Sequence, residues 1–143
     1  MNTTRTINLK SRPIGTPKLT DFDFSTLEIA ELLEDEVLLS TKYVSVDPYL
    51  RGRMSDAPSY IPPFELNKPI ASGIIAEVLA SKSNNFSKGD FVSGLLQWKE
   101  TQVAKADGLV KVDPAVAPLS AYLGVLGMTG LTAYMGLMEI GKP

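Results

Sequence analysis

Short runs of apolar and β-branched residues, each interrupted by glycine, proline or polar turn residues, dominate this sequence up to Val112. One of these runs, Val37–Val46, predicts a strand with most of both faces covered. Further runs of the same kind occupy 5–12, 21–29, 70–79, 91–96, 97–104 and 109–112. Several short strands at close spacing, separated by turns, are typical of a small barrel or sandwich. We therefore predict a mainly β fold for this part of the chain.

The character of the sequence changes after Pro118. Segments 119–126 and 129–140 predict two helices, because Pro118 suits a helix start and Gly141 suits a helix end. We accordingly divide the chain into a β domain, 1–118, and a helical connector, 119–143.

No charged residue occurs between Pro114 and Met138, so a membrane-spanning helix has to be considered for this segment. Frequent glycines lower its hydrophobicity, and neither flank carries a cluster of lysines and arginines. A buried connector between two domains is the better prediction. Leu131 and Tyr134 are then expected to face a core. Gly124, Gly127 and Gly130 indicate close packing, since they do not form a dinucleotide-binding fingerprint.

The composition excludes several kinds of site. The 143 residues include neither histidine nor cysteine, which are the usual ligands of zinc. A Ser-His-Asp or Cys-His catalytic group cannot be built from this chain. The net charge of −2 argues against a nucleic-acid partner or an anionic membrane surface. No signal peptide is recognised at the N-terminus, so a cytoplasmic location is expected.

The segment Tyr43–Met54 is the strongest candidate for a site. Pro48 is expected to end the long strand, and a loop that carries Asp47, Tyr49, Arg51 and Arg53 is expected to follow. Tyr49 is the best chemical candidate, because a phenol can donate a hydrogen bond to a carbonyl oxygen or to a developing enolate. Asp47 is expected to shape the turn. The two arginines either lie in solvent, pair with acids, or approach a phosphate.

The loop 55–69 contains four prolines and is predicted to be long but structured. Tyr60 and Phe64 are expected to anchor it to the body of the domain. Gly73 lies inside a predicted strand, where glycine marks a bulge or a close approach by another segment. Trp98 is expected to belong to the core or to the wall of a pocket.

Two segments carry a resemblance to a known family. Tyr43–Met54 (YVSVDPYLRGRM) and Leu123–Leu137 (LGVLGMTGLTAYMGL) resemble zinc-independent medium-chain dehydrogenase/reductases. The similarity is to the group of prostaglandin reductases, leukotriene hydroxydehydrogenases and alkenal double-bond reductases, and it runs from about Ile7 to the end. It implies a GroES-like, partly open β-barrel with C-terminal helices that lead to a nucleotide-binding domain outside this sequence.

The resemblance also implies a function. Members of this group are NADPH-dependent oxidoreductases that reduce the C=C bond of α,β-unsaturated aldehydes or ketones. By analogy Tyr49 lines the substrate pocket, while Met128 and Thr132 lie near the nicotinamide; helix packing is the alternative role for both. Asp47 stands where zinc-dependent relatives place a cysteine ligand, so no metal is expected.

Other functions stay open at this stage. One is a zinc-free quinone reductase, and another is a stand-alone GroES-like module that binds a protein partner. The 143 residues alone are expected neither to bind NADPH tightly nor to turn over enones. Their apolar helical segment is expected to promote self-association, and a homodimer is one of the partners considered.

Overall fold

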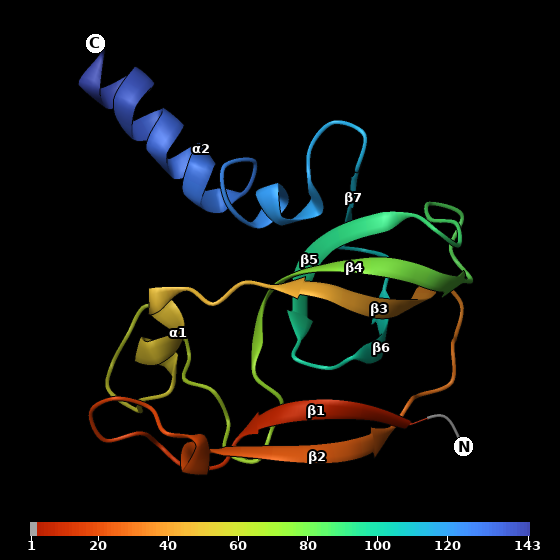
Figure 1. The fold of residues 1–143 in the computed structure, drawn as a ribbon, viewed down its shortest axis with the longest axis horizontal. Coiled ribbons are helices and arrows are strands. Elements are labelled where there is room, and N and C mark those ends of the chain that lie inside the picture. Colours follow the sequence, from red (N-terminus) through yellow and green to blue (C-terminus); the bar gives the residue numbers. More distant parts are fainter. Residues whose placement is uncertain (1–2) are drawn as a thin grey trace.

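The computed structural model describes residues 3–143 as two antiparallel sheets, with a helical segment that extends from the body (Figure 1). The strands are β1 (Thr3–Leu9), β2 (Phe22–Glu28), β3 (Glu36–Val44), β4 (Ala71–Ser81), β5 (Phe91–Gln97), β6 (Thr101–Lys105) and β7 (Val110–Val112). The α-helices are α1 (Pro48–Arg53) and α2 (Met128–Tyr134). The 3-10 helices are η1 (Leu19–Asp21) and η2 (Leu119–Leu123), and a π-helix, η3 (Met135–Gly141), continues α2.

The two sheets form a barrel that is not closed. Strands β1 and β2 make a ribbon, and the larger sheet has the order β6-β3-β4-β5-β7. The ribbon is attached through β1, where the N–H groups of Ile7 and Leu9 donate to the carbonyls of Trp98 (3.0 Å) and Lys68 (3.1 Å). The predicted mainly β, partly open GroES-like architecture is therefore confirmed.

Two groups of buried side chains stabilise this body. One lies along the large sheet and consists of Val37, Leu39, Ile74, Ala76, Val78, Phe86, Val92, Leu96 and Ala106. The other lies between the ribbon and α1 and consists of Leu9, Leu50, Met54, Phe64 and Ile70; we call it the α1 cluster. Trp98 packs against both groups. The prediction that this residue is a core or pocket-wall aromatic is confirmed.

The prediction that Val37–Val46 is covered on most of both faces is wrong for its second half. Val37 and Leu39 are fully buried, but Tyr43 and Val46 are exposed. The reason is that Thr41, Val44 and Val46 line a cavity instead of a packed core, whereas β6 covers only Glu36–Ser40.

A helix, α1, replaces the loop predicted after Pro48. Pro48 occupies its first position, where the missing N–H costs nothing and the fixed φ suits a helix. Leu50 and Met54 lie four residues apart, so both point to one side, and both are buried. Proline thus ends the strand and begins the helix.

The proline-containing loop 55–69 forms no helix or strand, as predicted. Of its two expected anchors, Phe64 is buried with 5% of its surface exposed, whereas Tyr60 is 91% exposed. The prediction for Tyr60 is wrong: Phe64 is the apolar anchor, and hydrogen bonds to Arg53 hold the loop beside it. Phe64 donates its N–H to the carbonyl of Arg53 (2.7 Å), and the Arg53 side chain binds the carbonyl of Pro62 (3.0 Å).

The predicted helix 119–126 is confined to η2. The chain folds back after it, and a Cβ atom on Gly127 would lie 2.5 Å from the Tyr122 carbonyl oxygen. At Gly130 a Cβ atom would lie 1.8 Å from the carbonyl oxygen of Val125. Only glycine fits such close backbone contacts. The glycines of this segment therefore make a compact turn, which interrupts the helix.

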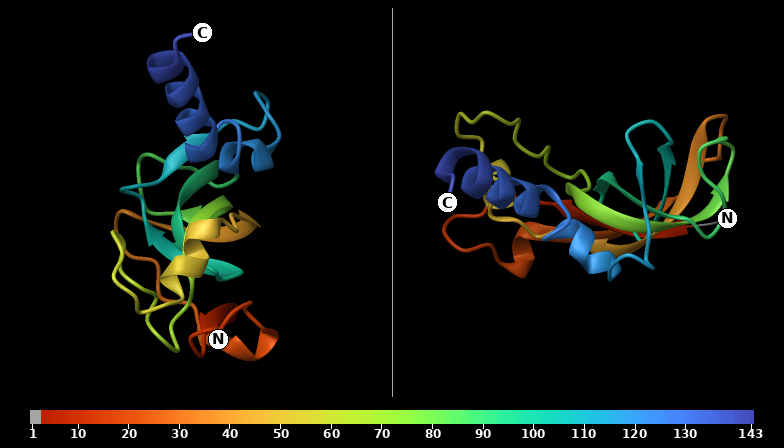
Figure 2. Two further views of the ribbon diagram at one scale, coloured as in Figure 1. Left: turned by 90° about the vertical axis from the view of Figure 1, so that its left-hand side faces the viewer. Right: turned by 90° about the horizontal axis from the view of Figure 1, so that it is seen from above.

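The second predicted helix is present as α2 and η3, which extend away from the body in Figure 1 and in the left view of Figure 2. Leu131 and Tyr134 are exposed, so the expectation that they face a core is not met within residues 3–143. No described helix has the length and apolar character needed to cross a bilayer.

Candidate functional site

Tyr49 lies on the first turn of α1, directly after the strand β3 and the segment 45–47 (Figure 1). Its ring packs against the α1 cluster and is half-buried. Burial raises the pKa of the phenol above its ordinary value, and the nearby charge of Asp47 raises it further. The hydroxyl therefore stays protonated at neutral pH and can donate a hydrogen bond to a ligand oxygen.

Asp47 has a local structural role. Its backbone precedes α1 in an extended conformation, and its carboxylate accepts a hydrogen bond from the Ser45 hydroxyl. This bond fixes the exit from β3. Ser45 is itself held by a hydrogen bond from its N–H to the carbonyl of Gly73 (2.8 Å). The backbone just before Tyr49 is therefore attached to the large sheet.

Arg51 and Arg53 hold loops against α1. The Arg51 guanidinium donates to the carbonyls of Pro13 (3.0 Å) and Gly15 (2.9 Å). The Arg53 guanidinium lies 4.0 Å from the centre of the Phe64 ring and also binds the carbonyl of Pro62. These contacts differ from the acid pairing or phosphate contact considered from the sequence. The two arginines therefore attach the turn 13–15 and the loop 62–64 to α1, the helix that carries Tyr49.

Met128 and Thr132 lie on α2, four residues apart and therefore on one side of the helix. The Met128 side chain is 82% exposed. The Thr132 hydroxyl donates to the carbonyl of Met128 (2.8 Å), a local bond of the kind expected for a packing role. Its oxygen can still accept a hydrogen bond.

The structure places α1 and α2 at the same end of the molecule (Figures 1 and 2). No hydrogen bond joins these two helices in the part of the chain that the structure describes. The convergence of Tyr49 with Met128 and Thr132 on one ligand therefore stays a prediction.

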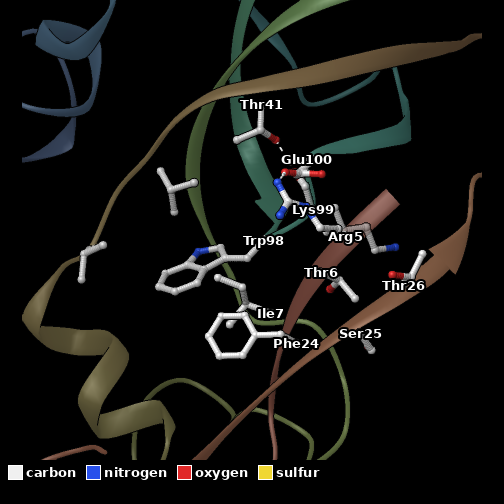
Figure 3. Close-up of a pocket in the computed structure, with 12 residues that line it drawn as sticks. Arg5, Thr6, Ile7, Phe24, Ser25, Thr26, Thr41, Trp98, Lys99 and Glu100 are labelled. Carbon is white, nitrogen blue, oxygen red and sulfur yellow. Dashed lines mark hydrogen bonds and ion pairs between the residues drawn. The ribbon is translucent and has the colours of Figure 1, made fainter. Parts of the chain in front are cut away.

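A cavity of about 530 Å³ opens between the β1–β2 ribbon and the end of β3 (Figure 3). None of Tyr49, Met128 and Thr132 lines it. Its wall contains Trp98, Phe24 and Ile7 on one side and a group of polar residues around Lys99 on the other. Of the residues that line this cavity, only Trp98 was predicted from the sequence as a possible wall residue. The other lining residues come from segments far apart in the chain, so no local pattern indicated that they meet.

Comparison with known proteins decides the family. A family model for the N-terminal domain of oxidoreductase matches residues 5–112. A putative NADP-dependent oxidoreductase of Bacillus subtilis, YfmJ, is 53% identical over 137 residues, which make up 96% of this chain and 40% of that protein. An NADPH-dependent curcumin reductase of Escherichia coli is 43% identical over 135 residues, which make up 94% and 39%. A 2-alkenal reductase of Nicotiana tabacum is 36% identical over 140 residues, which make up 94% and 41%.

The chain belongs to the zinc-independent medium-chain dehydrogenase/reductases. The crystal structure of CurA from Vibrio vulnificus in complex with NADPH shares this fold with a TM-score of 0.88 and 37% identity. That match covers 97% of this chain and 41% of the CurA chain. This medium-chain dehydrogenase/reductase chain thus spans about 40% of the length of the relatives it matches.

The described side chains of this family member offer no cluster of metal ligands. Among residues 3–143, no three carboxylates are placed so that they could hold a metal together. Asp47, the residue at the position of a cysteine ligand in zinc-dependent relatives, is hydrogen-bonded to Ser45 instead. The absence of a catalytic metal from the protein remains a prediction.

Proposed function

We propose that this chain is the substrate-side domain of an NADPH-dependent reductase that acts on the C=C bond of α,β-unsaturated aldehydes or ketones. The observation that carries the proposal is the position of Tyr49. Its phenol is half-buried, has a raised pKa, and stands on a short helix fixed to the sheet and to two loops. The activities named for the curcumin and 2-alkenal reductases support the same reaction class.

The proposed role of Tyr49 follows from the charge that develops in this reaction. Hydride addition to the β-carbon of an enone moves negative charge onto the carbonyl oxygen. A fixed, protonated phenol can donate a hydrogen bond to that oxygen, and the bond strengthens as the charge grows. Because burial and Asp47 both raise its pKa, the phenol remains a donor instead of becoming a phenolate.

NADPH, when bound, would supply the hydride. Met128 and Thr132 fit a place beside its nicotinamide, since the thioether is exposed and the threonine oxygen is free to accept a bond from a carboxamide N–H. Residues 119–143 would then connect the β domain 1–118 to a nucleotide-binding part of the protein. We expect the phosphates of NADPH to be held mainly outside this chain, so that residues 1–143 alone are inactive.

The test is the turnover of an enone by the whole protein with Tyr49→Phe. This change removes one oxygen and keeps the packing of the ring, so kcat should fall by about a hundredfold to a thousandfold. Tyr43→Phe is the matched control, because that tyrosine is exposed on β3 and should tolerate the same change. Full activity of the Tyr49→Phe enzyme would remove the basis of the proposal.

The same assay separates the alternatives. A preference for a quinone over an enone would indicate a quinone reductase. No turnover of either compound by the whole protein, combined with capture of a protein partner, would indicate a binding module.

A further inference from the structure

The cavity between the ribbon and β3 has two chemically different sides. Ile7, Phe24, Val44, Val46 and Trp98 supply apolar and aromatic surface. Figure 3 shows the Trp98 and Phe24 rings next to Ile7 on this side, and the paired charged groups of Arg5 and Glu100 farther away, near Thr41. A ligand that fills the cavity would therefore need an apolar body and a polar end.

The polar side carries an excess of positive charge. Arg5 and Glu100 form an ion pair, so their charges offset each other. Lys99 is partly buried, and its ammonium group has neither a hydrogen-bond acceptor nor a carboxylate partner among residues 3–143. The hydroxyl of Thr26, which also lines the cavity, makes no hydrogen bond within the same residues. Lys99 and Thr26 can therefore both donate a hydrogen bond to a ligand in the cavity.

Burial makes the unpaired ammonium unfavourable. It lowers the pKa of Lys99, because part of the water that would solvate the charge is excluded. Polar groups taken from water are normally given a partner, and charges more so. An anion bound beside Lys99 would supply the missing partner.

We propose that this cavity is a binding site for a small organic anion, an aryl-alkyl carboxylate, with its carboxylate on Lys99 and its ring against Trp98 and Phe24. The volume of about 530 Å³ lies within the range of small-molecule sites. A carboxylate on an ammonium forms a charge-assisted hydrogen bond, and offset ring packing stabilises the aromatic end. This site needs neither NADPH nor Tyr49, so it is independent of the proposed reaction.

The chain carries its own reporter. Trp98 is the only tryptophan, and it forms part of the cavity wall, so its fluorescence reports occupancy. The 143-residue chain is titrated with hydrocinnamate and, separately, with the neutral hydrocinnamyl alcohol, without NADPH. We expect a saturable change with the acid and at least about tenfold weaker binding of the alcohol, the loss typical of one charged hydrogen bond.

Three variants test whether the positive charge of Lys99 binds the carboxylate. Lys99→Met should weaken hydrocinnamate binding by about tenfold and leave the alcohol unaffected. Lys99→Arg should retain most of the affinity, which shows that the charge and not the fold is responsible. Lys88→Met, in the exposed β4–β5 turn and outside the cavity, should bind like the wild type. Unliganded Trp98 fluorescence checks that each variant is folded.

Three results would overturn the proposal: no saturable signal with hydrocinnamate, equal binding of acid and alcohol, or equal binding by the wild type and Lys99→Met. Loss of enone turnover in the whole protein would not contradict the proposed anion site, because the fluorescence titration involves no reaction. Conversely, failure of the titration would not affect the role of Tyr49.

Discussion

The Leu123 side chain lies against Gly73, with its Cδ2 atom 3.3 Å from the position that a Cβ atom on Gly73 would occupy. Gly73 belongs to β4, and Leu123 ends η2. This contact brings the start of the C-terminal segment onto the large sheet. Of the two roles predicted for Gly73, a bulge or a close approach by another segment, the structure shows the close approach, which the Leu123 side chain makes.

Gly73→Val should push Leu123 off the sheet. The added methyl groups exceed the available space, so we expect a loss of about 1–3 kcal/mol in the free energy of unfolding, measured by urea denaturation. Gly52→Ala is the control, because nothing lies within 4 Å of a Cβ atom there and Gly52 is inside α1. That change should stabilise the chain by about 0.4–1 kcal/mol. A Gly73→Val protein as stable as the wild type would show that the contact is unimportant.

The sequence predicted most of the strands because each has dense apolar or alternating residues and is bounded by turn residues. The sequence did not predict α1, because proline is compatible with two structures at position 48: the end of a strand and the first turn of a helix. Only the burial of both Leu50 and Met54, visible once the domain is folded, decides for the helix. In the sequence, Tyr60 and Phe64 are two similar aromatic residues in one loop. Only the folded structure distinguishes them, because the hydrogen bonds with Arg53 hold the loop near Phe64 and not near Tyr60.

Ser72→Ala should destabilise the junction between the two buried groups. The Trp98 indole N–H donates to the Ser72 hydroxyl at 2.8 Å, and Ser72 is completely buried. Without this acceptor the N–H loses its partner, which costs about 1–3 kcal/mol. Urea denaturation measures the change, and Trp98 fluorescence should shift as its environment changes.

Ser93→Ala provides the comparison for that experiment. Ser93 lies in β5, partly exposed, and its hydroxyl makes no hydrogen bond within residues 3–143. Its removal should change stability by no more than about 0.5 kcal/mol. Equal effects of the two serine variants would contradict the assigned role of the Ser72 hydroxyl.

Arg53→Lys should loosen the loop 55–63 specifically. Lysine keeps the charge but loses the planar stacking on Phe64 and the directed bond to the Pro62 carbonyl. Cleavage by chymotrypsin at the exposed Tyr60 should therefore become faster. Arg51→Lys is the matched variant, since Arg51 holds the turn at Pro13 and Gly15. It should leave cleavage at Tyr60 near the wild-type rate; acceleration by both variants alike would argue against separate anchors.

The two candidate sites differ in how many of their residues could be predicted from the sequence. Tyr49, Met128 and Thr132 stand in two continuous segments, so a resemblance could single them out. The cavity is assembled from β1, β2, the end of β3 and the segment after β5. Lys99 looks like an ordinary surface lysine in sequence, and its partial burial without a partner follows only from how the ribbon meets the sheet.

Asp90→Asn should lower stability in a pH-dependent manner. The Asp90 carboxylate accepts a bond from the Ser87 N–H (2.9 Å) and pairs with the Lys111 ammonium (2.7 Å) on β7. The hydrogen bond with Lys111 has the largest effect and lowers the pKa of Asp90. The bond from the Ser87 N–H lowers it further. A carboxylate whose pKa is lower in the folded state stabilises it at a pH above the unfolded value of about 3.9. That contribution is lost as the pH falls through the lower, folded-state pKa.

The measurement is the melting temperature of the wild type and of Asp90→Asn at neutral pH and at a pH below the folded-state pKa. The variant should melt lower at neutral pH, and the difference should shrink in acid, where the wild-type carboxyl is also uncharged. Added salt should reduce the neutral difference too, because Lys111 is largely exposed and its charge is screened. Asp23→Asn is the control at neutral pH: this exposed carboxylate on β2 makes no salt bridge or side-chain hydrogen bond within residues 3–143, so its change should leave the melting temperature near the wild-type value. A difference in melting temperature that is constant with pH would mean that Asp90 acts through its shape in the turn and not through its charge.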